Sequence, residues 1–410
     1  MSLTMQMIIA TIAGLAAGVV FGPSMGQIQF LGDIFLRLIQ MSVVFLVMGA
    51  IIESVGSCNP KDLGKIGGKA LFLFLITSII GAAVGLFFVN LIQPGAGVEG
   101  VAAATYKGAL FKGDTIQQFV NFVPKNVFEA MATGNVIQCI VFAALFGLSL
   151  SMTSDTEGSK KLYELIQYVN QTIFQVINIV IKFAPIGIFA LLGGVTGVVG
   201  LKVLIPLGKF LVTLTLAVLV SLGLLITFVS LYGRLNPIRL LKKCQRTIIV
   251  SITTTSSAIS LPVQMEDCEE RIGISKRVSR LVNPLAMSLN SNGLACTLSI
   301  ACVTVAQFFG IDLTLQQQIM IVFVSTVVTL GNLLVPGGAL VAMAVSFQMT
   351  GLPLEGIAIL AGVDWFAGII RTLLNVVGDI MVTLIVALSE NEFNREIWDA
   401  NEDQKINLSA

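Results

Sequence analysis

Long apolar segments separated by polar loops run through the first half of the chain. A helix needs about 20 apolar residues to cross a bilayer. The sequence therefore predicts six membrane-spanning helices here, over residues 7–21, 30–52, 70–92, 136–152, 165–199 and 204–231. Residues 95–135, between the third and the fourth of these, are polar and contain glycine. They predict an insertion exposed on one side of the membrane.

The pattern changes after Arg246. Residues 247–265 are too short to cross as a plain helix, and hydroxyl residues occupy their middle, namely Thr253, Thr254, Thr255, Ser256 and Ser257. Basic residues flank the segment on both sides, so the chain enters from the cytoplasm and returns there. This pattern predicts a re-entrant hairpin with a hydroxyl-rich tip.

Two further interruptions follow. The polar run Asn290-Ser291-Asn292-Gly293 breaks the apolar span 281–308, and Val335-Pro336-Gly337-Gly338 separates the apolar segments 319–334 and 339–349. Proline and glycine do not continue a helix, so the second break predicts another hairpin, entering from the outside. The order hairpin, broken span, hairpin, span indicates one unit used twice in opposite orientations. Paired interruptions of this kind mark the binding site of a transporter.

The last apolar segment, residues 356–388, is interpreted as one helix. At 100° per residue, its small and polar positions share a face about 100° wide. These positions are Asp364, Gly368, Arg371, Thr372, Asn375 and Asp379. A charge at the bilayer centre costs about 3 kcal/mol, so it usually faces a cavity and serves a function. The alternative is a buried ion pair that only orients helices, a role that does not need three charges together with Thr372 and Asn375.

Composition supports a polytopic membrane protein. Of the 410 residues 55% are hydrophobic and 11% are charged, and the mean hydropathy is +0.92. The net charge is +1 and no basic run indicates a nucleic-acid partner. The chain has no histidine, which excludes Ser-His and Cys-His catalysis, histidine metal sites and histidine haem ligation. Its 6 cysteines have no CxxC spacing, and we expect core residues rather than disulfides.

Basic residues indicate which loops are cytoplasmic. Lys61, Lys65 and Lys69 follow the second span, Lys160 and Lys161 follow the fourth, and Arg234, Arg239, Lys242, Lys243 and Arg246 follow the sixth. We therefore expect a multi-pass plasma-membrane protein with both termini in the cytoplasm, and residues 391–410 as a polar cytoplasmic tail. Residues 1–7 lack the basic region of a signal peptide and are interpreted as the start of the first span.

The interruptions can meet at one anion and cation site. Hairpin tips offer helix N-termini and free backbone amides to an anion. Arg371 offers a guanidinium suited to a carboxylate, and Asp364, two turns earlier on the same face, can hold that guanidinium in place. Asp379, with carbonyl oxygens near Asn290 and Asn375, makes the hard-oxygen site that Na⁺ prefers.

These motifs, in this order, resemble the dicarboxylate/amino acid:cation symporter family, to which glutamate transporters belong. The resemblance covers about residues 5–390. It rests on Thr255-Ser256-Ser257 followed by Leu261-Pro262, on Asn290-x-x-Gly293, on Val335-Pro336-Gly337-Gly338, and on Arg371-Thr372-x-x-Asn375-x-x-x-Asp379. Residues 183–189 of the fifth span, FAPIGIF, are also similar to the family.

The resemblance implies an all-α membrane protein of eight transmembrane helices and two re-entrant hairpins, with inverted repeats. It implies a homotrimer in membrane lipid that works by an elevator mechanism. Residues 1–69 and 130–235 would be mainly scaffold and trimerisation spans, with the third span and parts of 70–129 in the transport domain. Residues 236–390 would form the core transport domain, and residues 391–410 the tail.

The resemblance also implies residue roles. Arg371 would bind one carboxylate of a small anionic substrate, and Thr372 and Asn375 would complete the pocket. The two tips, Thr255, Ser256 and Ser257 in one and Val335, Pro336, Gly337 and Gly338 in the other, would hold the second carboxylate and gate access. Asp379 with Asn290 and Asn375 would form one sodium site, and Thr77, Ser78 and Asn292 would belong to a deeper one. No cofactor is implied besides sodium ions as coupling ions.

Several positions depart from the family pattern. Acidic amino acid carriers place an aspartate three residues before the arginine, to pair the ammonium of the substrate, and this chain has Gly368 there. The C4-dicarboxylate branch also lacks that aspartate. Asn292 replaces a carboxylate of the deeper sodium site, Ser291 and Leu294 replace a methionine and a threonine, and Phe74 stands where a tyrosine is usual.

The leading hypothesis is therefore a carrier for a small dicarboxylate, coupled to Na⁺, H⁺ or both. A second hypothesis is a Na⁺-coupled symporter for aspartate or glutamate, with an ammonium site rebuilt from hairpin carbonyls. A third is an anion channel lined by the tips and the polar face. An intramembrane hydrolase with Ser256 or Ser257 as nucleophile lacks a histidine or a nearby lysine to activate the hydroxyl. We therefore do not expect an enzyme.

Overall fold

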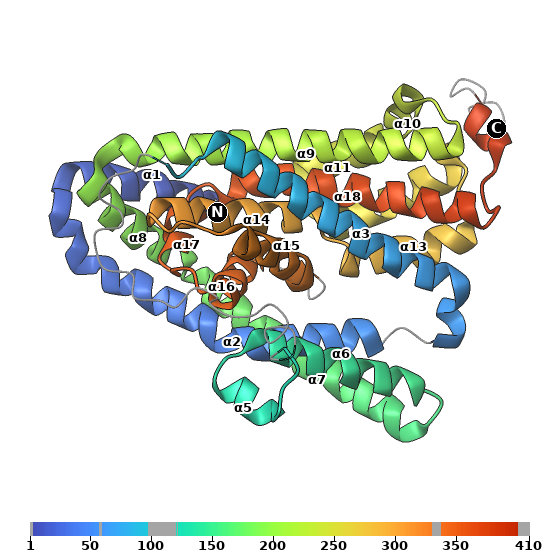
Figure 1. The fold of residues 1–410 in the computed structure, drawn as a ribbon, viewed down its shortest axis with the longest axis horizontal. Helices are drawn as coiled ribbons and strands as arrows, with labels where there is room; N and C mark the ends of the chain where they lie inside the picture. The colour runs from blue at the N-terminus through green and yellow to red at the C-terminus, as the bar shows by residue number, and fades with distance from the viewer. Residues whose placement is uncertain (1–2, 57–59, 97–119, 121, 330–337, 401–410) are drawn as a thin grey trace.

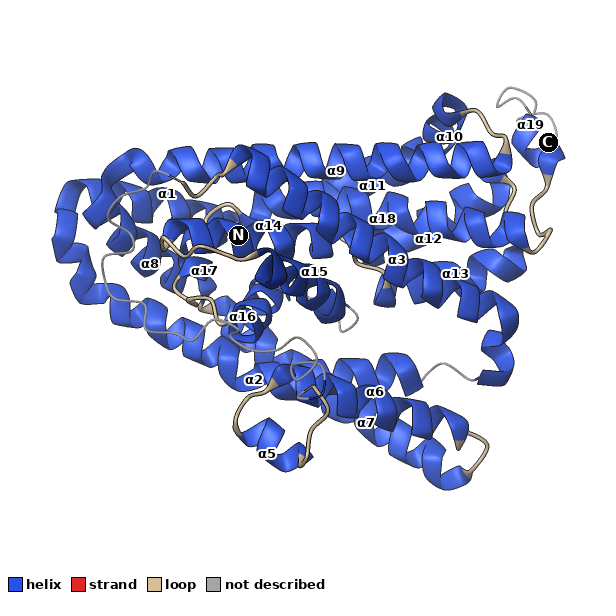
Figure 2. Ribbon diagram, viewed as in Figure 1, coloured by secondary structure: helices blue, strands red, loops and turns tan. Residues whose placement is uncertain are grey.

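The computed structural model describes residues 3–56, 60–96, 120, 122–329 and 338–400. Within these ranges the chain is helical, and the one β pairing is an isolated antiparallel bridge between Ile274 and Phe393 (Figure 2). The first half comprises α1 (Leu3–Phe21), η1 (Gly22–Ile28), α2 (Gln29–Gly56), α3 (Pro60–Ile92), α5 (Val127–Ala132), α6 (Val136–Met152), α7 (Glu157–Lys182), α8 (Ala184–Val199), η2 (Gly200–Val203) and α9 (Leu204–Gly233). These helices cover all six spans expected from the apolar pattern.

The second half consists of shorter helices and one long one. They are α10 (Pro237–Lys243), α11 (Gln245–Thr254), α12 (Ser257–Glu266), η3 (Asp267–Ile272), α13 (Lys276–Leu289), α14 (Asn292–Phe308), α15 (Leu315–Thr329), α16 (Gly338–Thr350), α17 (Gly356–Ala361), α18 (Asp364–Ser389) and α19 (Arg395–Asp399). The first hairpin is therefore formed by α11 and α12, and the broken span by α13 and α14. The predicted hairpin and the predicted break are both confirmed as interruptions of helical structure.

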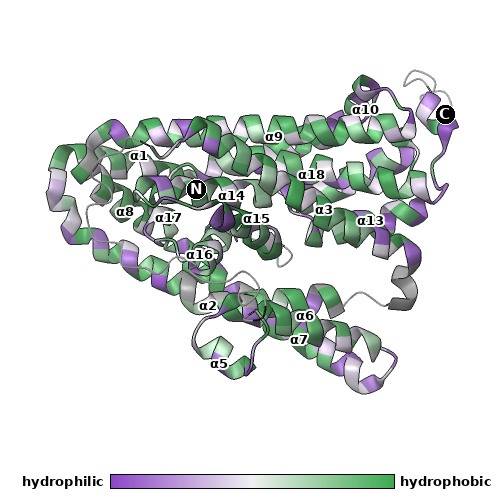
Figure 3. Ribbon diagram, viewed as in Figure 1, coloured by the Kyte–Doolittle hydropathy of each residue, from purple (hydrophilic) through white to green (hydrophobic). Residues whose placement is uncertain are grey.

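Long apolar helices make the molecule suitable for a membrane. Among the described residues, five helical stretches are long and apolar enough to cross one: Met5–Leu38, Lys65–Ile92, Gly200–Gly233, Lys276–Phe308 and Asp364–Ser389. Exposed apolar residues also lie on these helices, and much of the ribbon of α3 and α9 is green in Figure 3, the colour of hydrophobic residues. Phe72 and Phe87 are each 63% exposed, for example, which suits contact with lipid.

Two helices predicted as continuous are broken. The expected fifth span, residues 165–199, begins eight residues earlier in the structure and bends by 46° between α7 and α8. The bend precedes Pro185, which fits the first turn of a helix but not its interior. The segment 356–388 is likewise divided at Gly362 and Val363. A Cβ at Gly362 would lie 2.8 Å from a methyl carbon of Leu192, so the chain passes close to α8 at this break.

The helix α14 lies at the centre of the fold. It packs against α3, α9, α15 and α18, and almost all of its residues are buried (Figure 1). Glycines of α3 permit this contact, since a Cβ at Gly81 would lie 2.7 Å from the carbonyl oxygen of Asn292 and a Cβ at Gly85 2.5 Å from the hydroxyl of Ser299. The sequence after the break is therefore held tightly between α3 and α18.

A second group of helices packs along the lower edge of Figure 1. There α2 contacts α6, α7 and α8, and the Asn170 amide of α7 donates to a carboxylate oxygen of Glu53 on α2 at 2.7 Å. The helix α16 contacts both α2 and α6. The assignment of these helices to a scaffold and of the others to a mobile domain remains an expectation.

The segment after α18 is not a free tail. Residues 391–400 pack against the turn between η3 and α13: the amide of Ser275 donates to the carbonyl of Glu392 at 2.9 Å, and the amide of Asn394 donates to the carbonyl of Gly273 at 2.7 Å. Residues 401–410 lie outside the described part of the chain.

The five cysteines in the described ranges, Cys139, Cys244, Cys268, Cys296 and Cys302, are buried and unbridged, as the sequence predicted. Cys58 lies outside those ranges. Burial raises the pKa of the Cys244 thiol to about 12, so it stays protonated at neutral pH. These residues act as small core side chains.

Candidate functional site

The first hairpin turns at Thr255. This residue adopts a left-handed backbone conformation, with φ 50°, and α11 ends there. Ser256 is the N-cap of α12, and its hydroxyl accepts the amide of Ile259 at 3.3 Å. The tip contacts α18, because the Thr372 hydroxyl donates to the Thr255 carbonyl across 3.5 Å. The N-terminus of α12 is thus placed near the polar face of α18, where its dipole favours an anion.

Arg371 is held from one side. Its Nη1 atom lies 3.0 Å from Oδ1 of Asp364, and the two side chains are 15% and 8% exposed. Asp364 is the first residue of α18, where the helix dipole also stabilises a carboxylate. The ion pair therefore fixes the guanidinium without using all five of its N–H groups.

The other side of the guanidinium faces Gly368. A Cβ built at this position would meet only Nη2 of Arg371, at an ordinary contact distance of 3.4 Å. Among the described residues, Asp364 is the one acidic side chain paired with Arg371. The glycine therefore leaves space beside the guanidinium and supplies no second carboxylate.

Asp379 is bound at the break between α13 and α14. The Asn290 amide donates to Oδ1 of Asp379 at 2.7 Å, and the Thr77 hydroxyl of α3 donates to the Asn290 side-chain oxygen at 3.1 Å. All three side chains are buried. Three elements distant in sequence are thus joined by a chain of hydrogen bonds around one carboxylate.

Asn375 holds the start of α14. Its side-chain oxygen accepts the amide of Gly293 at 2.7 Å. A Cβ at Gly293 would lie 2.1 Å from the carbonyl oxygen of Arg371, so only glycine permits this contact between α14 and α18. Asn375 therefore stabilises the contact between α14 and α18, in addition to any role toward a ligand.

Asn292 and Ser78 each carry a buried polar atom without a hydrogen-bond partner. These atoms are Nδ2 of Asn292 and Oγ of Ser78. The Asn292 side-chain oxygen accepts the amide of Gly293 at 3.0 Å, and a Cβ at Gly378 would lie 2.3 Å from Nδ2. An amide N–H is a donor, so in this orientation Asn292 offers a cation no charge, and its oxygen already accepts a hydrogen bond.

The second tip is only partly described. Val335, Pro336 and Gly337 lie outside the described residues, and Gly338 is the buried first residue of α16. The limbs α15 and α16 do contact each other, as a hairpin requires. The structure thus brings together the site residues of the first hairpin, the break and α18, and leaves the place of the second tip open.

Polar residues outside the predicted set extend this region. Asn283, Gln264 and Thr383 are buried, and Asn283 accepts hydrogen bonds from the other two. The sequence signal was present: Asn283 precedes Asn290 by two helical turns, and Thr383 follows Asp379 by one. The sequence analysis did not select them, because single amides and hydroxyls in apolar helices commonly bond to their own helix.

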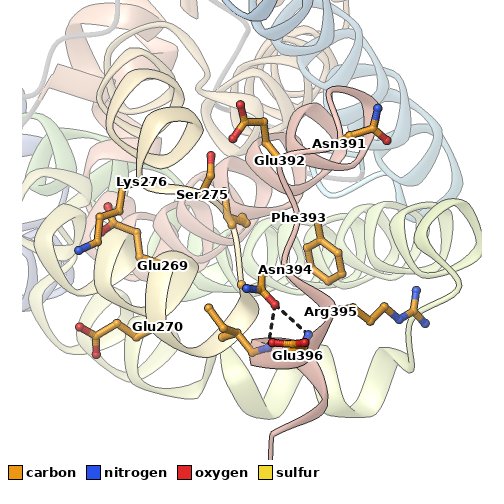
Figure 4. A pocket seen from close by; sticks show the side chains of 13 residues that line it. Glu269, Glu270, Ser275, Lys276, Asn391, Glu392, Phe393, Asn394, Arg395 and Glu396 are labelled. Atoms are coloured by element: carbon orange, nitrogen blue, oxygen red, sulfur yellow. Dashed lines mark hydrogen bonds between the residues drawn. The ribbon is translucent and has the colours of Figure 1, made fainter. Parts of the chain in front are cut away.

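A separate open pocket of about 1180 Å³ lies between η3, the start of α13 and residues 391–397 (Figure 4). Its lining carries charges of both signs, including Glu269, Glu270, Lys276 and Arg395. In Figure 4 the side chain of Asn394 caps α19 by accepting two backbone amides. None of the residues around Arg371 or Asp379 lines this pocket, so we do not assign the substrate to it.

Comparison with known proteins agrees with these features. The sequence model of the sodium:dicarboxylate symporter family matches residues 3–389. The chain is 33% identical to a proton/sodium-glutamate symport protein of Bacillus caldotenax, with 96% of each chain covered. It is 34% identical to a C4-dicarboxylate transport protein of Bacillus subtilis (strain 168), with 96% of this chain and 94% of that protein covered. A proton/glutamate-aspartate symporter of Bacillus subtilis (strain 168) is 31% identical, with 97% of each chain covered.

Proposed function

This chain belongs to the sodium:dicarboxylate symporter family, and from that premise we propose that it is a secondary-active carrier for a small dicarboxylate of the C4 class, coupled to Na⁺, H⁺ or both. The family consists of membrane transporters rather than enzymes. Relatives are named both as C4-dicarboxylate and as glutamate carriers, so the choice of substrate rests on the site.

The observation that carries the proposal is Gly368 beside Arg371. A dicarboxylate presents two anionic groups and no ammonium. One carboxylate can pair with the guanidinium on the side left open by Gly368, while Asp364 holds the opposite side. An amino acid would bring an ammonium into this region without a free carboxylate to receive it, and a buried unpaired charge is costly.

The second carboxylate of the substrate is assigned to the hairpin tips. At the described tip, the first-turn amides of α12 and the hydroxyls of Ser256 and Ser257 are candidates for hydrogen bonds to it. Thr372 and Asn375 complete the pocket from α18. Val335 to Gly338 would close it from the other hairpin and control access.

The coupling cation is assigned to Asp379, with oxygens near Asn290 and Asn375. Carboxylate and amide oxygens are hard ligands that suit Na⁺, and a proton could instead neutralise the same buried carboxylate. The deeper region of Thr77, Ser78 and Asn292 lacks a carboxylate and has an unpaired amide N–H. This chemistry supports fewer bound sodium ions than a site with an aspartate there.

The larger architecture is part of the same proposal. It has eight transmembrane helices and two re-entrant hairpins, assembled as a homotrimer with both termini in the cytoplasm. Residues 236–390, with the third span, would move as a transport domain against the scaffold in an elevator mechanism. The mutual packing of α2, α6 and α7 supports such a division, and α16 contacts α2 and α6 across it.

A specific observation favours a second candidate, a Na⁺-coupled symporter for aspartate or glutamate. The Thr255 carbonyl accepts the Thr372 hydroxyl at a long distance, 3.5 Å, and can accept an ammonium as well. Uptake of labelled succinate and labelled aspartate into proteoliposomes, under sodium and proton gradients, separates the two. Saturable succinate uptake that aspartate does not inhibit supports the proposal. Strong aspartate uptake that succinate does not compete with would overturn it.

A further inference from the structure

The buried side-chain amide of Asn283, two helical turns before the Asn290 break, joins three helices. The side-chain oxygen of Asn283 on α13 accepts from the Gln264 amide of α12 at 2.9 Å and from the Thr383 hydroxyl of α18 at 2.9 Å. Its amide nitrogen donates to the Ser279 hydroxyl at 3.1 Å. All four side chains are at most 1% exposed. Asn283 thus uses its acceptor and its donor at the meeting point of α12, α13 and α18.

Asn283 and Asn290 form two cross-links between the same pair of helices. Asn290 caps the C-terminus of α13, seven residues after Asn283, and bonds to Asp379. Asn283 bonds to Thr383, one turn after Asp379 on α18. The earlier residue, Asn283, bonds to the later residue of α18, Thr383, as expected for antiparallel helices. Residues seven apart on α13, and four apart on α18, lie on one face of each helix. Two such cross-links determine both the rotation and the axial register of α13 against α18.

The cross-link at Thr383 lies one helical turn after Asp379, whose carboxylate is assigned to the cation, and contacts the Asp379 backbone. The Thr383 hydroxyl is 2.9 Å from the Asn283 oxygen and 2.7 Å from the backbone carbonyl of Asp379, so its single proton is shared between the neighbouring helix and its own. A displacement of α13 at Asn283 would therefore be transmitted to Asn290, which holds the Asp379 side chain at 2.7 Å.

The first hairpin depends on the same amide. Gln264 lies on α12, seven residues after the tip residue Ser257, and its side chain is 1% exposed. Through Asn283 it connects the returning limb of the hairpin to α18, whose Thr372 meets the tip at the Thr255 carbonyl. Directional bonds between buried amides specify one arrangement, whereas apolar contacts would tolerate a sliding of the helices.

We infer that Asn283 is a positioning residue that sets the register of the first hairpin and the Asn290 break against Asp379, and so couples the substrate side of the site to its cation side. This inference rests on the proposed symport function. It assigns Asn283, Gln264 and Thr383 a role in cation affinity although none of them would touch the cation.

The test uses Thr383, because its hydroxyl can be removed without changing the shape of the side chain. Thr383→Val deletes the cross-link to Asn283, and Thr383→Ser retains it. Thr304→Val is the matched control: Thr304 is equally buried, on α14, and its hydroxyl donates within its own helix to the Ile300 carbonyl at 2.7 Å. Gln264→Leu removes the other bond to Asn283 and leaves Thr383 in place.

Two measurements decide the inference. In the first, purified protein without ligand is analysed by hydrogen–deuterium exchange, and Thr383→Val and Gln264→Leu should speed exchange in α12 and α13 relative to Thr304→Val. In the second, the cation concentration for half-maximal uptake should rise about fivefold in Thr383→Val, the size expected for one lost buried hydrogen bond. The maximal rate should stay near that of the wild type, and Thr383→Ser should restore the wild-type value.

The inference is overturned if exchange in α12 and α13 is unchanged, if Thr304→Val has the same effect as Thr383→Val, or if only the maximal rate falls. Failure of the wild-type protein to transport a dicarboxylate contradicts the proposed function instead. In that case the ligand-free exchange experiment still decides whether Asn283 holds the hairpin against α18.

Discussion

The anion that Arg371 can bind depends on the residue three positions before it. Asp364 pairs with one side of the guanidinium, and Gly368 leaves the other side open. The same guanidinium with a carboxylate at position 368 would attract a cationic group into the pocket. We therefore expect a neutral position to influence specificity as much as the charged residues around it.

Arg371→Ala should abolish high-affinity binding of the dicarboxylate. Truncating one partner of a buried, hydrogen-bonded charge pair costs about 2–5 kcal/mol, so we expect at least about a thirtyfold loss of affinity. Isothermal titration with succinate in detergent measures this loss. Asp364→Asn, which keeps the guanidinium, is the control, and unchanged affinity in a folded Arg371→Ala protein would refute the assigned role.

Gly368→Asp should shift the preference from dicarboxylates toward acidic amino acids. The glycine Cβ position is 3.4 Å from Arg371 Nη2 and free of other contacts, so the new side chain has room. One favourable charge pair is worth about 2 kcal/mol in such a site, which predicts a change of about thirtyfold in the ratio of aspartate to succinate uptake. Gly368→Asn has the same size without the charge, and an equal shift in both variants would argue against electrostatic selection.

Asp379→Asn should weaken the cation dependence more than the substrate contact. The substitution keeps the shape of a side chain that bonds to Asn290 at 2.7 Å but removes its negative charge. We expect the sodium concentration for half-maximal uptake to rise at least about tenfold, corresponding to about 1.4 kcal/mol. If uptake of succinate keeps its sodium dependence, the coupling cation binds elsewhere.

At the scale of elements, the contacts of the candidate site come from the places where helices are interrupted. The tip at Thr255 and the break at Asn290 contact α18 at Thr372 and Asp379, and Asp364 at the start of α18 pairs with Arg371. Each interruption also leaves backbone groups without a partner in its own helix. Such groups persist inside a membrane protein only where side chains or a cavity satisfy them. The breaks therefore concentrate the hydrogen-bonding capacity of the molecule at its centre.

The C-terminal segment, residues 391–400, is a second element to consider, because it packs at the base of the first hairpin. Trp398 on α19 is 3% exposed, with Arg239 and Lys243 of α10 5.7 and 5.3 Å from its ring centre. The Lys243 ammonium also lies 3.3 Å from the Ile397 carbonyl and bonds to that of Arg271 at the base of the hairpin. Residues 391–400 thus fasten the first hairpin to the end of α18 and to α10.

Trp398→Ala should lower the stability of the hairpin base. Truncating a buried aromatic side chain costs about 3–5 kcal/mol in a core, and less where the site can collapse. We expect a lower thermal unfolding midpoint and faster hydrogen exchange in residues 267–275. Tyr232→Ala, which removes an aromatic side chain that is 52% exposed, is the control and should leave both unchanged. Equal effects of the two variants would show that α19 does not fasten the hairpin.

At the scale of the whole molecule, the packing of α14 between α3, α9, α15 and α18 connects the candidate site to several long helices. The match to a symporter family supports a carrier rather than a static pore.

A carrier should accumulate its substrate against a gradient. In proteoliposomes with an inward sodium or proton gradient, we expect saturable uptake of succinate above the equilibrium level, abolished by an ionophore that collapses the driving gradient. An anion channel would give a flux that neither saturates with succinate nor exceeds equilibrium. Accumulation that persists after the ionic gradients are removed would contradict cation coupling.

Local sequence patterns were sufficient to place most helices and their breaks. The six early spans, the hairpin turn at Thr255 and the break at Asn290 follow from apolar length and from polar residues that cannot lie unpaired in lipid. The error at Gly362, predicted inside one helix, arose because a single glycine does not end a helix by itself. Its close approach to Leu192 comes from a helix distant in sequence.

The sequence by itself determined the class of molecule and the polar face of α18, because helical periodicity and the cost of burying charge are local properties. Tertiary structure decided the partners. Asn290 holds Asp379, Asn375 is engaged by Gly293, and Asn283 joins α12 to α18. These bonds connect residues 82 to 100 positions apart. No periodicity within one helix specifies which distant side chain will satisfy a buried amide, so only the packing of the helices could assign those roles.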